Sequence, residues 1–286
     1  MNILLLGKNG QVGWELARSL APLGQVVACD SLELDLADPD ALRKTVRELE
    51  PGIIVNAAAH TAVDKAESEP GLAMKVNGYA PGILAEEASR LDSLLVHYST
   101  DYVFDGKQQG SYSENDPANP LSIYGKTKLA GEEAIRASCA KHLIFRTSWV
   151  YGMRGRNFLL TMLRLAQERE EIKVIDDQIG APTWCRMIAE ATSIAVSGFR
   201  ENLSGTYHMT AGGSTSWHGF AAAILELSSP EKKPALTPIP TEDYPLPAAR
   251  PQNSILSNEK LQSGFGLQLP DWKSGLKLCL DAAGSW

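Results

Sequence analysis

The first half of this 286-residue chain alternates short apolar runs with longer segments that have the hydrophobic period of a helix. The apolar runs occupy residues 2–7, 25–30, 52–59, 93–100 and 141–151. The longest helical pattern between them extends from about residue 70 to residue 90. Parallel strands need a crossover connection, usually helical, so this alternation predicts repeated βαβ units. We therefore expect an α/β fold with a doubly wound parallel sheet of the Rossmann type.

The turn after the first predicted strand is rich in glycine. In "GKNGQVG" the residues Gly7, Gly10 and Gly13 stand between that strand and the first predicted helix. Such a turn lets the backbone approach a pyrophosphate, and the helix directs its free N–H groups at the anion. A strand before the glycines and a helix after them are the context in which this motif indicates dinucleotide binding. Glycines that serve only a tight turn are the alternative.

The second predicted strand ends at Asp30, where a carboxylate can accept hydrogen bonds from an adenosine ribose. By charge, Asp30 favours NADH over NADPH, although Lys8, Arg18 or Arg43 could offset it. Beyond residue 151 the alternation loosens. We expect residues 1–150 to form an NAD(P)-binding Rossmann domain. Residues 151–286 should form mainly a smaller α/β substrate-binding lobe, with some elements returning to the first domain.

Composition excludes several classes of function. The net charge of −7 argues against a nucleic-acid partner, which would need a basic surface. The four cysteines are far apart and include no C-x-x-C pair, so neither a zinc site nor a redox motif is indicated. No apolar stretch approaches the roughly 20 residues that span a bilayer, and the N-terminal apolar run is too short for a signal peptide. We expect a cytoplasmic protein with no membrane partner.

A tyrosine and a lysine lie four residues apart in "YGKTKLAGE", at the predicted start of a helix. Tyr124 and Lys128 would share one helix face, where the lysine charge and an oxidised nicotinamide favour the phenolate. The pair is thereby tuned as an acid or base near working pH. The fourth strand ends in Ser99, Thr100 and Asp101, at the sheet edge where ligands of doubly wound folds bind. A hydroxyl, the tyrosine and the lysine together predict the polarisation of a carbonyl that receives a hydride.

Six segments of the sequence carry a family resemblance: "GKNGQVG", "NAAAHTAVDKAESEP", "VHYSTDYVFDG", "PLSIYGKTKLAGE", "FRTSWVYG" and "DQIGAPT". Together they resemble the extended short-chain dehydrogenase/reductases, over nearly the whole chain. Within that family they are most similar to members that act on 4-keto nucleotide sugars. The resemblance implies reduction of the C4 ketone of dTDP-4-dehydro-β-L-rhamnose to dTDP-β-L-rhamnose by NADPH or NADH, the last step in making activated rhamnose for polysaccharides.

The resemblance also implies residue roles. Tyr124 would be the proton donor, Lys128 its modulator and a ligand of the nicotinamide ribose, and Thr100 the partner of the carbonyl. The cofactor would be held by Gly7, Gly10, Gln11, Val12, Asp30, Asp35, Leu36, Ala59, His60, Thr61 and Tyr98, besides Tyr124 and Lys128. The substrate would be contacted by Thr100, Asp101, Trp149, Arg250 and Asn253, with Trp149 walling the sugar pocket and Arg250 pairing with the diphosphate.

Some family members are Mg²⁺-dependent dimers that use acidic residues on their own helices. Glu15 stands in the matching first helix, but Arg186 occupies a position where a carboxylate would help. This departure argues against a dimer-bridging metal; a bound Mg²⁺ and a choice between monomer and homodimer are left open, and we assign no metal ligands.

Three other functions compete with this interpretation. Another nucleotide-4-keto-sugar reductase would use the same residues, because the product epimer depends on pocket shape. A non-catalytic regulatory subunit on the same fold could dispense with Thr100, Tyr124 and Lys128, so their presence argues against it. An epimerase or dehydratase that uses tightly held NAD is the third. Dehydratases of this superfamily commonly place a carboxylate pair beside the strand-end threonine, whereas "STDY" has one acidic residue, so reduction is favoured.

Overall fold

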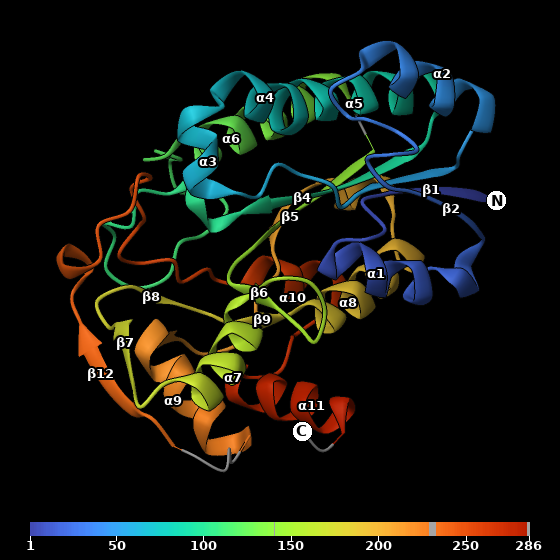
Figure 1. Ribbon diagram of the computed structural model, residues 1–286. Coiled ribbons are helices and arrows are strands. Elements are labelled where there is room, and N and C mark those ends of the chain that lie inside the picture. Colours follow the sequence, from blue (N-terminus) through green and yellow to red (C-terminus); the bar gives the residue numbers. More distant parts are fainter. Residues whose placement is uncertain (140, 229–232, 285–286) are drawn as a thin grey trace.

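The computed structural model describes residues 1–139, 141–228 and 233–284, and a six-stranded sheet runs through its upper half (Figure 1). Its strands lie in the order β10-β5-β4-β3-β1-β2, and every neighbouring pair is parallel. They are β1 (Asn2–Leu6), β2 (Gln25–Cys29), β3 (Ile53–Asn56), β4 (Leu94–Thr100), β5 (His142–Thr147) and β10 (Gly205–His208). The predicted α/β fold with a doubly wound parallel sheet is confirmed.

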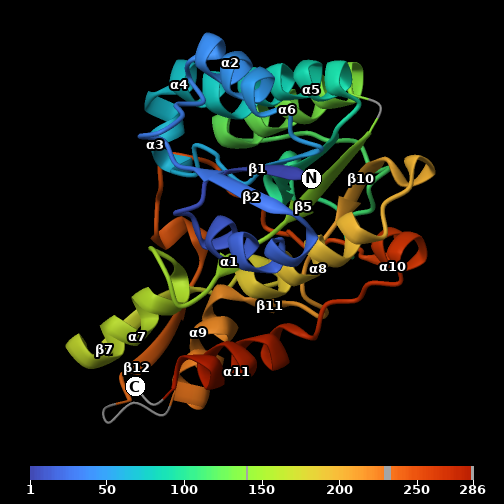
Figure 2. The ribbon, with the colours of Figure 1, turned by 90° about the vertical axis from the view of Figure 1, so that its right-hand side faces the viewer.

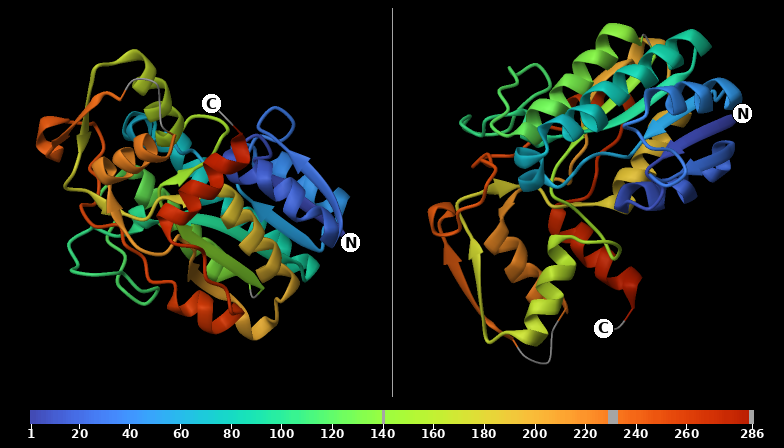
Figure 3. Two further views of the ribbon diagram at one scale, coloured as in Figure 1. Left: turned by 90° about the horizontal axis from the view of Figure 1, so that it is seen from below. Right: turned by 45° about the horizontal axis from the view of Figure 1, so that its top comes forward.

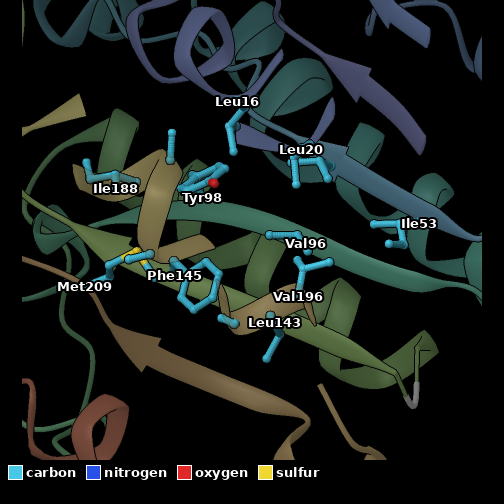
Figure 4. Packing of buried hydrophobic residues seen from close by; sticks show 14 of the residues in the cluster. Leu16, Leu20, Ile53, Val96, Tyr98, Leu143, Phe145, Ile188, Val196 and Met209 are labelled. Atoms are coloured by element: carbon cyan, nitrogen blue, oxygen red, sulfur yellow. The ribbon is translucent and has the colours of Figure 1, made fainter. Parts of the chain in front are cut away.

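Helices cover both faces of this sheet (Figures 1 and 2). One face carries α1 (Gln11–Ser19) and α8 (Cys185–Ser197), and the other carries α2 (Pro39–Leu49), α5 (Ala80–Leu91) and α6 (Ile123–Ser138). Side chains alternate along β1: Ile3 and Leu5 join the first layer, Leu4 and Leu6 the second. Figure 4 shows the first layer, in which Leu16 and Ile188 of the two helices meet the strands. Burial on both faces explains why the strands read as continuous apolar runs.

Local sequence fixes where these helices begin. The Asp38 carboxylate accepts hydrogen bonds from the N–H groups of Asp40 and Ala41, both at 3.0 Å, ahead of Pro39 in the first turn of α2. The Ser122 hydroxyl accepts the Gly125 N–H at 3.2 Å and opens α6. Short 3₁₀ turns occur at Ala21–Leu23, Asp101–Val103, Glu201–Leu203 and Thr241–Asp243.

The helix predicted over residues 70–90 contains an irregular turn. It consists of α4 (Pro70–Met74), a π-helical turn (Lys75–Tyr79) and α5, preceded by α3 (Val63–Ser68). The wider turn carries the buried Asn77, whose side chain accepts the His60 N–H at 2.8 Å and donates to the His60 carbonyl at 3.1 Å. π-helical turns are rare and often occur at functional sites. This one places Asn77 where it fixes the backbone of the segment after β3.

The strand predicted over residues 141–151 is shorter in the structure. β5 ends at Thr147, and Trp149 adopts a left-handed backbone with φ of +46°, which a strand cannot continue. The chain then resumes as β6 (Val150–Tyr151), which pairs with β9 (Thr183–Trp184).

A second group of elements forms a smaller lobe beside the large sheet (Figures 1 and 3). β7 (Glu171–Ile175) pairs with β12 (Ala235–Ile239), and β8 (Ile179–Gly180) with β11 (Thr215–Ser216). The helices of the lobe are α7 (Phe158–Glu168), α9 (Trp217–Ser228) and α11 (Trp272–Ala283), which share a buried cluster with Phe220 and Leu276. After residue 150, however, α8, β10 and α10 (Glu259–Phe265) pack with the large sheet. None of the helices described is long and apolar enough to cross a membrane.

Candidate active site

Tyr124 lies in the first turn of α6 and meets the carboxyl end of β4. Its hydroxyl shares a hydrogen bond with the side chain of Thr100, the buried last residue of that strand. The Tyr124 ring also packs edge-on against Tyr102, with centroids 5.7 Å apart. The structure thus brings the predicted proton donor and its hydroxyl partner together at the sheet edge where ligands of this fold bind.

Lys128 follows one helical turn later and is buried, with 2% of its surface exposed. Its Nζ donates to the Tyr98 carbonyl at 2.5 Å and lies 3.1 Å from Nε2 of His97. Burial lowers the pKa of Lys128 to about 8, against the charge of Glu132, which raises it. The lysine can therefore change its charge near neutral pH.

Burial raises the pKa of Tyr124 to about 12, although the hydrogen bond with Thr100 opposes the shift. The direction is opposite to the tuning that the Y-x-x-x-K spacing predicts, because burial dominates the shift. The Lys128 amine is directed at Tyr98 and His97 instead. A phenol in this state keeps its proton at neutral pH and is an acid rather than a base.

Asp101 lies beside these residues, with 3% of its surface exposed. Its Oδ1 accepts the Thr100 hydroxyl at 2.9 Å. Burial raises the pKa of Asp101 to about 6, because the hydrogen bonds from Ser254 and Thr100 offset only part of the cost of a buried charge. This carboxyl group is close to changing its protonation state at working pH.

The glycine turn has the close approach that the sequence predicts. A Cβ on Gly13 would lie 2.0 Å from the Gly7 carbonyl oxygen, and one on Gly7 2.8 Å from the Ala58 nitrogen. Gly10 caps α1 with no side chain over the helix start, so the N–H groups of Gln11 and Val12 face outward. The Gln11 side chain is tied to the lobe, since its Oε1 accepts from Asn157 at 2.7 Å. These groups fit a pyrophosphate at the end of α1.

Asp30 is partly buried after β2, and its Oδ2 accepts from Asn9 at 2.6 Å. The Leu32 N–H lowers its pKa most, so the carboxylate stays charged. Of the three cations that could offset this charge, Arg18 lies over the Trp14 ring and Arg43 pairs with Glu86 and Glu87. Lys8 pairs with Glu33, and its charge also acts on Asp30. Farther along, Asp35 accepts the Ala37 N–H at 2.9 Å and Leu36 is buried.

The predicted contacts to the middle of the cofactor divide into two groups. Ala59, His60 and Thr61 follow β3 in the segment that Asn77 holds by the His60 backbone. The side chain of Tyr98 instead points into the first core layer, where its hydroxyl lies 2.7 Å from that of Thr192 (Figure 4). Any contact of Tyr98 with a cofactor would therefore have to use its backbone.

Trp149 joins the end of β5 to the lobe. Its ring stacks on Trp217 of α9 with centroids 3.6 Å apart and planes within 6°. A Cβ on Gly180 would lie 2.6 Å from this ring, so glycine is needed beneath it. A bulky residue with positive φ is strained and persists where its surroundings fix it, often at a ligand site.

Arg250 and Asn253 are bound within the chain. The two Nη atoms of Arg250 contact the Asp64 carboxylate at 3.1 and 2.8 Å. The Asn253 amide donates to the carbonyls of Gln108 and Gly110 at 2.8 and 2.6 Å. Their substrate contacts stay predictions, and a diphosphate would have to compete with Asp64 for the guanidinium.

Sequence reasoning missed three polar residues around Lys128. His97 interrupts an otherwise apolar strand, Asn56 closes β3, and Asn77 lies inside a helix; all three are buried. A buried polar residue in an apolar run is the signal that could have found them. Within residues 1–139, 141–228 and 233–284, no three histidine, cysteine or acidic side chains are grouped as metal ligands.

A dinucleotide turn, a strand-end hydroxyl and a tyrosine–lysine helix on a doubly wound sheet define an NAD(P)H-dependent oxidoreductase of the short-chain dehydrogenase/reductase class. Residues 1–285 match the family described as RmlD substrate binding domain, and the chain belongs to that family. It is 52% identical to the dTDP-4-dehydrorhamnose reductase of Burkholderia thailandensis, with 98% of each chain covered.

Two solved structures agree with this assignment. A dTDP-4-dehydrorhamnose reductase from Clostridium acetobutylicum is 39% identical with a TM-score of 0.94, covering 99% of both chains. The enzyme of that name from Bacillus anthracis, solved in complex with NADP, is 37% identical with a TM-score of 0.93, covering 98% of this chain and 99% of its own.

Proposed function

We propose that this protein reduces the C4 ketone of dTDP-4-dehydro-β-L-rhamnose to dTDP-β-L-rhamnose with NAD(P)H, the last step of dTDP-L-rhamnose synthesis. The observation that carries the proposal is the contact between Tyr124 and Thr100 at the carboxyl end of β4. The names of the relatives and the NADP bound to the Bacillus anthracis enzyme support the substrate and the cofactor.

The residues act on the ketone oxygen. Tyr124 and Thr100, whose hydroxyl turns from Asp101 to the substrate, donate hydrogen bonds that orient and polarise the carbonyl, and Tyr124 gives its proton to the oxygen as it becomes negative. The charge of protonated Lys128, one turn further along α6, favours the phenolate that remains. Asp101 contacts the sugar and Trp149 walls its pocket, and Arg250 and Asn253 complete the substrate site.

The cofactor would be held along the carboxyl ends of β1 to β4. Gly10, Gln11 and Val12 bind its pyrophosphate and Asp30, Asp35 and Leu36 its adenosine end, while the segment Ala59–Thr61 borders the middle. The bound nicotinamide supplies the hydride. By charge, Asp30 favours NADH over NADPH; Arg43 is paired with Glu86 and Glu87, while the charge of Lys8 still acts on Asp30.

The remaining assignments of this proposal concern the assembly and its surroundings. We assign the protein to the cytoplasm as a monomer or homodimer, with no nucleic-acid or membrane partner. Residues 1–150 form the cofactor domain and residues 151–286 supply mainly the substrate lobe.

The test follows the absorbance of NADPH and NADH, in separate reactions with dTDP-4-dehydro-L-rhamnose generated in situ. We expect cofactor oxidation, with dTDP-L-rhamnose identified by NMR. Oxidation that yields a different epimer would assign another 4-keto-sugar reductase. Cofactor binding with no oxidation would favour the regulatory-subunit alternative.

A variant then tests the proton donor. Tyr124→Phe should lower kcat by about 10²–10⁴-fold and leave the Kd of the cofactor nearly unchanged, since only the transition state needs the proton. Tyr207→Phe makes the same change on the remote strand β10, where the hydroxyl donates to the Leu203 carbonyl, and should keep full turnover. Equal losses in rate and in cofactor affinity for Tyr124→Phe would contradict the assigned role.

A further inference from the structure

Three buried polar side chains form a chain behind the candidate catalytic lysine. Asn56 and His97 lie opposite each other in the register of β3 and β4, and each is 1% exposed. The Asn56 Nδ2 lies 3.2 Å from Nδ1 of His97, and Nε2 of the same ring lies 3.1 Å from Nζ of Lys128. The chain therefore connects the end of β3, through β4, to α6.

The hydrogen bonds of Asn56 decide where the His97 proton lies. Its Oδ1 accepts the Ala58 N–H at 3.2 Å, so its NH₂ group faces Nδ1 of His97. Nδ1 is then an acceptor, and the ring proton of a neutral imidazole lies on Nε2. That N–H faces Nζ of Lys128, which can complete the bond only by offering the lone pair of an uncharged amine.

A charged Lys128 requires the reverse arrangement. An ammonium must donate to Nε2, which moves the ring proton to Nδ1 and requires the Asn56 oxygen to face it. The Ala58 N–H then loses its acceptor, which carries a cost. Protonating the lysine thus opposes a backbone hydrogen bond two residues after β3.

We propose that Asn56 and His97 are positioning residues that couple the charge of Lys128 to the tautomer of His97. The proposal deepens the proposed function and rests on the role assigned there to Lys128. A lysine held in this way keeps a fixed place beside the site and can both carry and release a proton during turnover. The Ala58 N–H lies next to Ala59, so the predicted cofactor segment and the lysine share one hydrogen-bond system.

The charges around Lys128 agree with this coupling. Tyr124 faces it from the preceding turn of α6, and Glu132 from the next turn, where the carboxylate is paired with Arg146 of β5 and with Arg136. From the π-helical turn, Asn77 is neutral and bonds to Thr127. Burial, with the nearby Lys128 charge, holds the pKa of His97 well below its usual value, so the ring stays neutral.

The first experiment needs neither substrate nor cofactor. NMR of ¹⁵N-histidine-labelled protein should show His97 as the neutral Nε2–H tautomer at about pH 9.5, above the Lys128 midpoint, and as the neutral Nδ1–H tautomer at about pH 6.5, below it, with the signal assigned by its loss in His97→Gln. A tautomer that is the same at both pH values, or an imidazolium, would overturn the proposal. Because no turnover is measured, this outcome is independent of whether the proposed reaction occurs.

The second experiment reverses the tautomer. In Asn56→Asp the carboxylate can accept from both the Ala58 N–H and Nδ1–H, so Nε2 becomes an acceptor for the ammonium. The midpoint of Lys128, followed by its ¹³Cε shift and by the alkaline limb of kcat/KM, should rise by about 1–2 pH units. His142→Gln replaces a buried histidine of β5 that contacts the Cys139 carbonyl, and should leave the midpoint in place.

Two results for Asn56→Asp would overturn the coupling. A raised midpoint with an unchanged tautomer would show simple attraction by the new carboxylate. A reversed tautomer with an unmoved midpoint would show that His97 does not set the charge of Lys128. If Asn56→Asp does not fold, the tautomer of the unaltered protein still decides the question.

Discussion

Two buried carboxyl groups beside β4 have pKa values shifted in opposite directions. Glu132 on α6 has no exposed surface, and Asp101 after the strand has 3%. Burial alone would raise the pKa of Glu132, but hydrogen bonds and charge from Arg146, with Ser99 and Arg136, outweigh it and hold the pKa below its usual value. Arg146 binds the carboxylate through Nε at 2.9 Å and Nη2 at 2.6 Å.

Asp101 has no such partner among the residues described. Its hydrogen bonds come from hydroxyl and backbone groups, and burial raises its pKa to about 6. The comparison separates two uses of a buried acid. Glu132 is paired with arginines and links α6 to β5. The charged form of Asp101, beside Tyr124, is destabilised by burial, and a carboxyl group with such a raised pKa is typical of a ligand-binding or catalytic site.

The largest expected effect concerns the matched acid. Glu132→Ala leaves Arg146 buried without its carboxylate, so the free energy of unfolding should fall by about 3–5 kcal/mol. Urea unfolding followed by circular dichroism measures it. Glu133→Ala, at the exposed neighbouring position, is the control and should stay within about 0.5 kcal/mol of the unaltered protein. Similar losses for both variants would remove the distinction between the two carboxylates.

Replacing Asp101, which has no cationic partner among the residues described, should instead stabilise the protein at neutral pH. The pKa of Asp101 is raised from 3.8 to about 6, so between these values the folded state binds more protons than the unfolded state. Stability therefore falls as pH rises through this window, by up to about 3 kcal/mol. Asp101→Asn should remove this loss: it should match the unaltered protein near pH 4, exceed its stability at pH 7, and turn over more slowly.

Urea unfolding at several pH values measures both trends. For Glu132, whose pKa is lowered, the stabilisation is present above about pH 4.5 and is lost as pH falls. As pH rises, the stability lost in Glu132→Ala should thus grow, whereas Asp101→Asn should go from equal stability to greater stability than the unaltered protein. Parallel slopes would contradict the assignment of the two groups.

The parts of the molecule that depend on local pattern could be predicted from sequence. Strand runs, the glycine turn and the Tyr124–Lys128 spacing each lie within a few residues, and the structure places Tyr124 against Thr100 as that pattern predicts. The substrate class came from resemblance, because pocket shape has no local signature. The expected strand 141–151 failed at Trp149, whose positive φ depends on stacking with Trp217, 68 residues later.

Features that depend on register between distant segments were not predictable. Asn56 meets His97, and Ser99 lies opposite Arg146, only because β3, β4 and β5 align at those residues. The side chain of Tyr98 turns to Thr192 on α8 because alternate residues of a strand point to opposite faces. Sequence identifies these polar residues as unusual in apolar strands, and the fold supplies their partners.

The smallest expected effect concerns the partly exposed ion pair of Arg250 and Asp64, which is less buried than either Glu132 or Asp101. Asp64 lies in α3, and Arg250 lies three residues before Asn253, which forms a bridge with Ile179 of β8. The ion pair therefore links this late segment to α3, with 16% of the Arg250 side chain and 38% of the Asp64 side chain exposed. Arg250→Ala should raise the apparent KM for the nucleotide sugar about 10-fold and lower kcat less, as loss of a charge-assisted phosphate contact predicts.

Asp64→Asn sharpens this prediction, because it frees the guanidinium without removing it. If Arg250 binds the diphosphate, Asp64→Asn should leave KM unchanged or lower it, and the gap between the two variants should narrow at high salt. If the pair instead only fastens the segment to α3, both variants should raise KM alike, and the diphosphate contact must lie elsewhere. Steady-state kinetics on the two single variants and the double variant distinguishes these cases, since a shared fastening role makes the effects non-additive.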